Sequence, residues 1–522
     1  MSTKIPEWDL WGAELIKMPY EGSLYQTVYG CYNSPYTDFV VGTFVKNVKL
    51  VGLNGVRHDT IAPQPACESD VHGCGWKDDT GKKWPSLNLF ATREFFKRMY
   101  RETHGGAVKD GFVCYPVAGP PINAFDAVSD IHHIGEGSFE KAHTLKEGYS
   151  PEDVRIRMVG TQYGYVSQNN LKGTPITPVE RVAALIVHGA EPRLMGSGLP
   201  SSYFRGYQKG NGHNPNTKDV WEAWKWIDRG RTSLWRPYWE NADTLTVTGP
   251  DKAEIYGSYY YIPGEKVLLI VTNYEPAPLA DIEARLDLKK LGFGADDKLF
   301  AEDAITSEPV ALKDGAVKLG IFSQRFRMVK ISREIPRYNA DRLGPNLLAG
   351  GGFESWPEGF QVAAPLTEQG EPYAAKDTTV FHSGIASLRL TKLGTELKAG
   401  QVYSVPCAVE KGRYLLSGYL RLDADLKAPL EGANPRPDYN HVTIGLNGPG
   451  LVTDPPREFS MWGGSYPIGE RTPGWQKFMI PFDATEETKT VSIQLVQFGG
   501  GTAWLDDLQL QKVNDEEVRV GR

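Results

Sequence analysis

The sequence predicts an α/β domain followed by all-β domains: a partial (β/α)8 barrel, then an antiparallel β-sandwich, then a C-terminal β jelly roll. Strand-like and helix-like stretches alternate through residues 1–240, whereas short stretches of period two fill residues 241–335 and residues 345–512. A polar link with two prolines, residues 335–346, separates the last two segments. Alternating strands and helices indicate parallel βαβ units, and period-two runs indicate antiparallel sheets.

The first segment contains about six predicted strands, at residues 28–33, 55–60, 112–118, 129–136, 157–164 and 191–196. Stretches with helical spacing of apolar residues lie between them, at residues 37–51, 87–106, 178–191 and 218–231. Because a closed barrel of this kind has eight strands, we expect the first strands of the barrel to be missing from this chain.

The two later segments differ from the first in carrying strands without helical stretches. Runs such as KVLLIVTNY and FRMVKIS predict the strands of a small antiparallel sandwich. Runs such as SLRLTKL, GRYLLSGYLRL and VSIQLVQF predict the two sheets of a jelly roll. The sandwich carries no cluster of catalytic residue types, so we expect it to have a structural role.

Composition and charge exclude several classes of protein. The 57 basic and 64 acidic residues of this 522-residue chain give a net charge of −7, which argues against a nucleic-acid partner. No apolar run is long enough to span a membrane, and the first residues lack the pattern of a signal peptide, which leaves localisation open. Five cysteines are too few, and odd in number, for a disulfide framework. Aromatic residues make up 11% of the chain, and sugar rings stack on flat aromatic faces.

Two acidic residues end predicted strands of the first segment. Asp59 ends the strand GVRHDT, with Arg57 on the same face, and Glu136 ends SDIHHIGE, with His132 on the same face. Catalytic groups of parallel barrels stand at these strand ends, and a pair of carboxylates is what glycosidic bond hydrolysis needs. Acidic residues at strand ends also cap helices or form ion pairs, and the sequence pattern alone does not distinguish these structural roles from a catalytic role.

The long loop at residues 66–86 offers two interpretations. Cys67, His72 and Cys74 suggest zinc, but CxxC spacing and a second cysteine pair are absent, which favours a loop that lines a substrate cleft. The candidate binding residues of this loop are Glu68, His72 and Trp76, with Trp84 also available to the cleft. Nucleotide-binding, serine-hydrolase and HExxH metalloprotease motifs are absent from the sequence.

Two runs of the first segment, CYNSPYTDFVVGTFVKNVKLVGLNGVRHDT and HGCGWKDDTGKKWPSLNLFATREFFKRMY, carry a resemblance. They resemble bacterial glycoside-hydrolase-like proteins grouped loosely with glycoside hydrolase family 123. The resemblance implies a barrel whose first strands precede this point, exported proteins, and Asp59 and Glu136 at strands four and six. The sequence departs from that group at Arg57 and His58, and the adjacent Asp-Glu pair of family 123 is not evident, so its sugar specificity is not carried over.

The last segment resembles carbohydrate-binding modules of families 4, 9 and 22. Its opening NLLAGGGFE, its run FHSGIASLRL and its closing AWLDDLQL carry the likeness. The resemblance implies a structural calcium ion between Glu354 and Asp507, and hard oxygen ligands suit that ion.

The sequence therefore predicts a glycoside hydrolase acting on a poly- or oligosaccharide by a two-carboxylate mechanism, with retention favoured and inversion left open. Asp59 is the predicted nucleophile, or the base if the enzyme inverts, and Glu136 is the predicted general acid, with no cofactor needed for catalysis. A non-catalytic carbohydrate-binding protein and a polysaccharide lyase, with Tyr32 or His132 as base, remain alternatives. A homo-oligomer or a partner chain could complete the barrel. The predicted substrate-binding residues are Tyr32, Arg57, Glu68, His72, Trp76, His132 and Tyr163.

Overall fold

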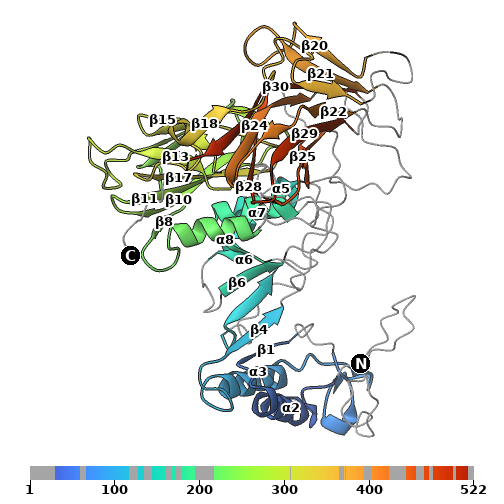
Figure 1. Cartoon of the computed structure of the whole chain (residues 1–522). Helices are drawn as coiled ribbons and strands as arrows, with labels where there is room; N and C mark the ends of the chain where they lie inside the picture. The colour runs from blue at the N-terminus through green and yellow to red at the C-terminus, as the bar shows by residue number, and fades with distance from the viewer. Residues whose placement is uncertain are drawn as a thin grey trace. The chain divides into compact units, whose positions relative to one another are not determined.

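The structure is a computed structural model of the chain, and more of the described residues lie in β-strands than in helices (Figure 1). The chain divides into two compact units: residues 1–181 with 188–195, and residues 182–187 with 196–522. The structure describes residues 30–58, 66–116, 127–134, 144–159, 166–170, 178–193, 217–305, 307–363, 370, 372–392, 401–422, 442–453, 464–468, 474–497 and 501–514.

The first unit contains a five-stranded parallel sheet of order β1-β4-β5-β6-β7. Each strand pairs with the one that precedes it in this set, and every pairing is parallel. The order therefore never reverses, unlike that of a doubly wound sheet, which reverses at its ligand-binding crevice. The strands are β1 (Gly55–Arg57), β4 (Phe112–Pro116), β5 (Ile131–Ile134), β6 (Val166–Asn170) and β7 (Glu191–Arg193).

Two predicted strands of the first segment are not strands as expected. Of the described residues near 28–33, only Gly30 makes a strand-type bridge, and the following residues form a turn. The stretch predicted at 157–164 begins inside helix α6 (Pro151–Met158), and β6 starts later. The helix begins there because Ser150 Oγ accepts a hydrogen bond from Asp153 N (3.3 Å) and proline occupies the first helical position.

Helices α2 and α3 pack on one face of the sheet, where apolar residues of both helices meet Val113 and Tyr115 of β4. Arg98 Nη1 of α3 lies 2.7 Å from Asp38 Oδ1 of α2 and ties the two helices together. Helix α2 ends at Gly52, whose φ of 69° needs a residue without a side chain. The helices of the described residues are α2 (Tyr36–Val51), α3 (Leu89–Thr103), α5 (Leu145–Gly148), α6, α7 (Pro178–Val187) and α8 (Thr217–Trp226).

The second unit begins with the predicted antiparallel sandwich, a six-stranded sheet facing a four-stranded sheet. Inward residues such as Leu269, Ala284 and Val329 form its core. The larger sheet has the order β14-β13-β17-β11-β10-β8 and the smaller one β15-β16-β12-β9. The strands are β8 (Leu234–Arg236), β9 (Leu245–Thr248), β10 (Ile255–Ile262), β11 (Lys266–Asn273), β12 (Leu279–Leu286), β13 (Phe300–Asp303), β14 (Pro309–Val310), β15 (Leu312–Lys313), β16 (Ala316–Ile321) and β17 (Phe326–Ser332).

The C-terminal part of this unit is a second pair of antiparallel sheets, as the period-two patterning predicts. Its core is built from both sheets by residues such as Leu388, Leu416 and Leu495. The sheets have the orders β20-β21-β30-β24-β28-β26 and β19-β22-β29-β25-β27, and β18 pairs with β30, so the opening and closing strands lie side by side. The elements are η2 (Ala340–Arg342), β18 (Leu343–Asn346), β19 (Phe360–Val362), β20 (Ala374–Asp377), β21 (Ser387–Lys392), β22 (Gln401–Ser404), β23 (Cys407–Ala408), β24 (Gly412–Leu422), β25 (Val442–Asn447), β26 (Leu451–Thr453), β27 (Gly464–Ile468), β28 (Gln476–Ala484), β29 (Thr490–Gln497) and β30 (Gly501–Val513).

Candidate functional site

The register of the parallel sheet decides which predicted site residues share a face. Arg57 pairs with Cys114, and Tyr115 pairs with His132. Paired residues of neighbouring strands project from the same face, and consecutive residues of one strand project from opposite faces. Tyr115 belongs to the core under α2 and α3, so His132, which is 1% exposed, lies on that helix-covered face. Arg57 therefore projects from the opposite face.

The predicted catalytic pair, Asp59 and Glu136, lies outside the described residues, as does Tyr163, so these assignments stay predictions. His58, the last described residue before Asp59, donates its backbone N–H to Cys114 O (3.0 Å). Its ring stands edge-on to Phe95, with 5.0 Å between the ring centroids. Burial lowers the pKa of His58 to about 4, so the imidazole is neutral at pH 7.

Tyr32 lies in the apolar core of the first unit. It is 8% exposed, and its ring stacks on Phe95 with 4.2 Å between the ring centroids. A base must reach the proton that it abstracts from a substrate. The burial of Tyr32 and His132 therefore does not favour either as the base of a lyase.

The loop at residues 66–86, which follows β1 in the chain, forms a small antiparallel hairpin. Strand β2 (Trp76–Lys77) pairs with β3 (Lys83–Trp84), and Cys67 forms a bridge with Ser86 at the base of the loop. We call residues 76–84 the tryptophan hairpin. Glu68, a half-buried residue of the same loop, packs its backbone against Gly75, whose φ of 80° and tight contacts leave no room for a side chain.

The two indole rings of the tryptophan hairpin are exposed and nearly parallel. Trp76 is 57% exposed and Trp84 is 40% exposed, and their ring centroids are 6.2 Å apart with 17° between the planes. Asp78 fixes one ring by accepting a hydrogen bond from Trp84 Nε1 (2.8 Å). Hydrogen bonds from Thr80 and Trp84 lower the pKa of Asp78 to about 2. The hairpin therefore presents two nearly parallel aromatic rings to solvent, and a hydrogen bond to Asp78 holds one of them.

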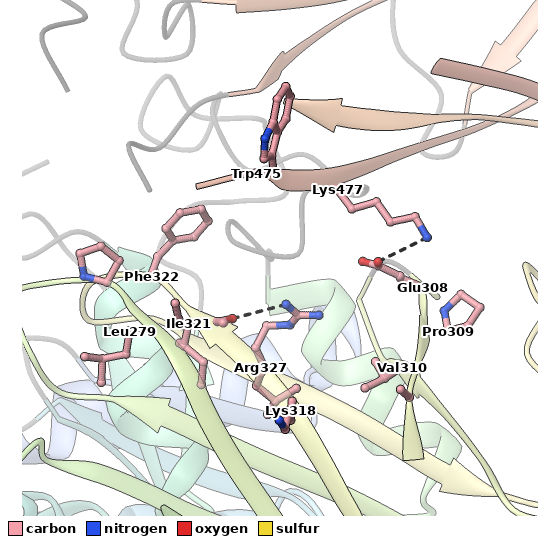
Figure 2. Close-up of a pocket in the computed structure, with 15 residues that line it drawn as sticks. Leu279, Glu308, Pro309, Val310, Lys318, Ile321, Phe322, Arg327, Trp475 and Lys477 are labelled. Atoms are coloured by element: carbon pink, nitrogen blue, oxygen red, sulfur yellow. Dashed lines mark hydrogen bonds and ion pairs between the residues drawn. The ribbon is translucent and has the colours of Figure 1, made fainter. Parts of the chain in front are cut away.

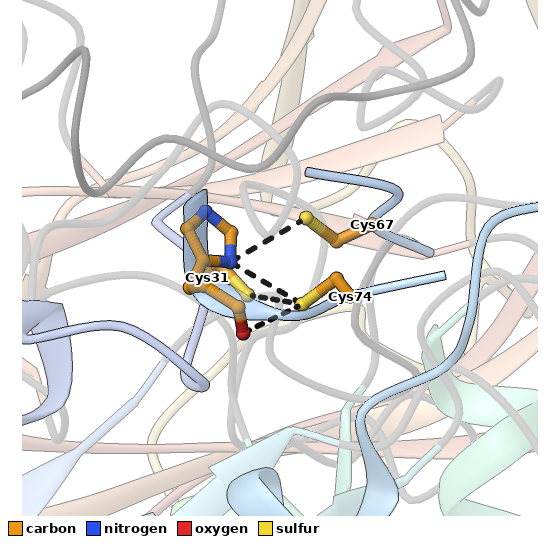
Figure 3. A group of neighbouring side chains, drawn as sticks. Cys31, Cys67 and Cys74 are labelled. Carbon is orange, nitrogen blue, oxygen red and sulfur yellow. Dashed lines mark hydrogen bonds between the residues drawn. The ribbon is translucent and has the colours of Figure 1, made fainter. Parts of the chain in front are cut away.

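Three cysteine sulfurs and one imidazole nitrogen converge where the turn before α2 meets the loop that carries this hairpin (Figure 3). We call Cys31, Cys67, His72 and Cys74 the Cys3His cluster. The four ligand atoms lie within 4.8 Å of one another, and the three cysteines are at most 3% exposed. Cys31 Sγ is 3.6 Å from Cys74 Sγ, and His72 Nδ1 is 3.2 Å from Cys74 Sγ and 3.9 Å from Cys67 Sγ.

The backbone of the loop turns tightly to bring these groups together. The short 3-10 helix η1 (Asp70–His72) begins at Ser69, whose Oγ accepts a hydrogen bond from Val71 N (3.3 Å). Gly73 then adopts a φ of 66°, and Cys74 N donates to Ser69 O (2.9 Å). This turn sets the imidazole of His72 and the sulfur of Cys74 side by side.

An asparagine amide donates to two sulfurs of the cluster. Asn88 Nδ2 lies 3.2 Å from Cys31 Sγ and 3.1 Å from Cys74 Sγ. Ser86 Oγ donates to Asn88 Oδ1 (3.2 Å), which orients the amide with its NH2 group toward the sulfurs. Asn88 is the residue before helix α3, yet its side chain does not cap that helix. Its hydrogen bonds serve the cluster instead.

The sequence pattern indicates only three of these four residues as possible zinc ligands. Cys31 was expected inside a strand, whereas it lies in a turn that carries its sulfur to Cys74, 43 residues further along the chain. The available signal was the odd cysteine count, with four of the five cysteines among the first 114 residues. Burial and the neighbouring Cys74 raise the pKa of the Cys31 thiol.

The C-terminal pair of antiparallel sheets brings the predicted calcium ligands to the two ends of one short segment, residues 382–385. Glu354 Oε1 accepts a hydrogen bond from Ile385 N (2.9 Å), and Asp507 Oδ1 accepts one from Ser383 Oγ (2.8 Å). His382 Nδ1 lies 2.7 Å from Asp507 Oδ2. Both carboxylates thus hold the same segment, and a calcium ion between them stays a prediction.

A separate pocket in the second unit is lined by Leu279, Ile321, Phe322 and other residues of the sandwich, together with Trp475 and Lys477 (Figure 2). Two ion pairs involve its charged side chains, and the first joins Glu308 Oε1 to Lys477 Nζ at 3.6 Å. Arg327 Nε lies 2.6 Å from the buried Asp303 Oδ2. These pairs have a structural role.

No family model and no curated protein matches the chain, so the resemblance to glycoside hydrolase family 123 is not confirmed. The similar solved structures include glycoside hydrolases and carbohydrate-binding domains. An α-amylase from Anoxybacillus aligns with a TM-score of 0.37 and 10% sequence identity, and the alignment covers 63% of this chain and 72% of the amylase chain. The isomalto-dextranase of Arthrobacter globiformis T6, complexed with panose, has a TM-score of 0.33 and 10% identity, covering 93% and 74%.

The CBM22-1 xylan-binding domain of Xyn10C from Paenibacillus barcinonensis covers 33% of this chain and 98% of its own, with a TM-score of 0.22 and 14% identity.

Among the residues that the structure describes, no helix is both long and apolar enough to cross a membrane.

Proposed function

We propose that this chain binds and hydrolyses a poly- or oligosaccharide, with the tryptophan hairpin as a sugar-binding surface. The exposed, nearly parallel rings of Trp76 and Trp84 carry this proposal. A sugar ring presents a flat face of C–H groups, which packs on an exposed aromatic ring. Exposed apolar surface with a polar rim marks binding sites, and here Asp78 and Lys82 form that rim, with Lys82 Nζ 3.9 Å from the centre of the Trp84 ring.

The place of the hairpin in the chain also supports the proposal. It belongs to the loop that follows β1, and ligands of parallel α/β sheets bind at the carboxyl ends of the strands. Because the five strands are parallel and in sequential order, the loops after them leave the same edge of the sheet. Sequential parallel order is typical of a (β/α)8 barrel, and we propose that this sheet is part of one.

The proposed hydrolytic groups are Asp59 as nucleophile and Glu136 as general acid, since they follow β1 and β5 in the chain. In a retaining enzyme the two carboxyl groups stand about 5–5.5 Å apart, and the acid protonates the leaving oxygen while the nucleophile attacks the anomeric carbon. Asp59→Asn and Glu136→Gln would each remove turnover and leave glycan binding in place.

The test is glycan binding by calorimetry, together with product analysis by chromatography, on a panel that includes xylan, panose and β-1,4-galactotriose. We expect Trp76→Ala and Trp84→Ala to weaken binding at least tenfold, and Phe90→Ala, which removes an 86% exposed ring elsewhere in the first unit, to leave it unchanged. Equal binding by wild type and both tryptophan variants would refute the surface. Binding without product would establish the non-catalytic alternative.

We propose in addition that the jelly roll is a carbohydrate-binding module with a structural calcium ion at Glu354 and Asp507. Their carboxylates lie at either end of residues 382–385, where Glu354 accepts a hydrogen bond from Ile385 N and Asp507 accepts one from Ser383 Oγ. Carboxylate and carbonyl oxygens are the ligands that calcium prefers. Calcium should raise the unfolding temperature of wild type but not of Glu354→Gln with Asp507→Asn.

A further inference from the structure

We propose that the Cys3His cluster is a structural zinc site, with the sulfurs of Cys31, Cys67 and Cys74 and the Nδ1 atom of His72 as ligands. The four groups come from two parts of the chain: a turn before helix α2, and the loop after β1. The proposal of a metal site is argued from the distances between the four ligand atoms alone. Only the role of this site in holding a sugar-binding hairpin rests on the function proposed above.

The distances agree with a zinc tetrahedron. Zinc–sulfur bonds of about 2.3 Å and zinc–nitrogen bonds of about 2.0–2.1 Å place two sulfurs about 3.8 Å apart, and a sulfur and a nitrogen about 3.5 Å apart. The sulfurs of Cys31 and Cys74 are 3.6 Å apart, and Nδ1 of His72 lies 3.2 Å and 3.9 Å from two sulfurs. All four ligand atoms lie within 4.8 Å of one another, so a single ion can contact them all after small side-chain adjustments.

The chemistry of the donors selects the ion. Three sulfurs and one imidazole are soft to borderline ligands, and a tetrahedral set of this kind favours zinc over calcium or magnesium. Four protein ligands fill the coordination sphere, which is typical of structural rather than catalytic zinc. The site therefore adds a fixed link to the fold and no reactive water.

The surroundings of the cluster fit charged sulfur ligands. Asn88 Nδ2 donates to two of the sulfurs, at 3.2 Å and 3.1 Å. Asn33 Nδ2 donates to His72 O (2.7 Å) and holds the ligand turn against the segment that carries Cys31. Hydrogen bonds to ligand atoms orient a metal site and are typical of its outer shell.

A disulfide is the competing use of these sulfurs. A disulfide would need a distance of about 2.05 Å between two of the sulfurs, and it would not explain why the third cysteine and the imidazole lie beside them. The arrangement of all four groups around one point favours the ion.

The loop also carries the tryptophan hairpin, since Cys74 is two residues before Trp76 and Cys67 is bridged to Ser86 at its base. Zinc would thus hold the aromatic surface in place.

The experiment measures metal in the full chain, purified without chelator after expression with added zinc. Mass spectrometry of metals should find one zinc ion per chain in wild type, and well under half of that in Cys31→Ser and Cys67→Ser. Cys407→Ser is the matched control, because it changes a buried cysteine outside the cluster, and it should keep one zinc ion. Iron in place of zinc, absence of metal after reconstitution, or equal loss in the control would overturn the proposal.

A second measurement needs no variant and so does not depend on how variants fold. Cobalt(II) added to the metal-free wild-type chain should give strong visible absorption of a tetrahedral site and near-ultraviolet charge-transfer bands from thiolate ligands. Spectra of an octahedral cobalt ion, or alkylation and mass analysis that find Cys31 and Cys74 joined as a disulfide, would overturn the proposal. Neither readout depends on a sugar ligand, so failure of the zinc site and failure of the proposed function are separable.

Discussion

Replacing Asn88 by alanine removes two N–H donors from the sulfurs of the Cys3His cluster and leaves all four ligands in place. The lost contacts are those to Cys31 Sγ (3.2 Å) and Cys74 Sγ (3.1 Å). The change does not remove a helix cap, because the Asn88 side chain makes no capping hydrogen bond to α3. The expected effect therefore falls on the metal and not on the fold.

The size of that effect follows from the outer-shell role of the amide. Loss of such a partner weakens metal binding about 10- to 100-fold. That range corresponds to about 1.4–2.7 kcal/mol of binding free energy. Because one amide serves two sulfurs here, we expect Asn88→Ala to lie toward the upper end of the range.

The assay is competition for zinc between the protein and a chromophoric chelator, with Asn54→Ala as control. Asn54 is an exposed asparagine of the same unit, so the control matches the chemical change without touching the cluster. A zinc dissociation constant for Asn88→Ala within about twofold of wild type would refute the reasoning, since this is far below the tenfold minimum expected from the outer shell. An equal change in Asn54→Ala would refute it as well.

Three further predictions concern stability and the hairpin loop. Burial lowers the pKa of His58 to about 4 from its unperturbed 6.5, so the folded state binds fewer protons than the unfolded state between these pH values. The free energy of unfolding therefore falls as the pH drops from 6.5 to 4. Urea unfolding should show a smaller fall of this free energy in His58→Gln than in wild type, and an identical fall would contradict the assignment. Asp303→Asn removes the buried negative charge that pairs with the half-buried Arg327 at 2.6 Å, and should destabilise the chain by about 3–5 kcal/mol in denaturant unfolding. A loss below about 1 kcal/mol would show that the pair is dispensable. Removing zinc with a chelator should speed tryptic cleavage after Lys77 and Lys83 severalfold, and an unchanged rate would mean that the metal does not hold the loop.

The antiparallel parts of the chain were predictable because their signal is local. Alternation along runs such as β24 and β29 reports which residues face the core of a sheet, and both sandwiches follow from it. The parallel sheet was predictable in kind, since strands alternate with helices. The bounds of its strands were not predictable: the N-cap at Ser150 starts a helix that continues into the first residues, 157 and 158, of a stretch expected to be strand.

The candidate site was harder to predict because it depends on register and on distant contacts. Period two places Arg57 relative to the other residues of its own strand. Whether it shares a face with His132 depends on how β1, β4 and β5 are aligned, and the register puts the two residues on opposite faces. Buried parallel strands are apolar on both faces, so their sequence does not specify that alignment. Cys31 was missed for a related reason, because its partner Cys74 is 43 residues away and no short motif joins them.

The tryptophan hairpin explains why a metal would be needed at this point of the fold. Its strands are two residues long, and a two-stranded hairpin is marginally stable in water even when longer. The rings that would bind a sugar are exposed and add little to a core that could hold the loop. A zinc ion at Cys74, two residues before Trp76, supplies binding free energy directly to the ordered state of the loop. If zinc is removed and glycan binding is lost while the sheet stays folded, the site acts by holding the hairpin in place.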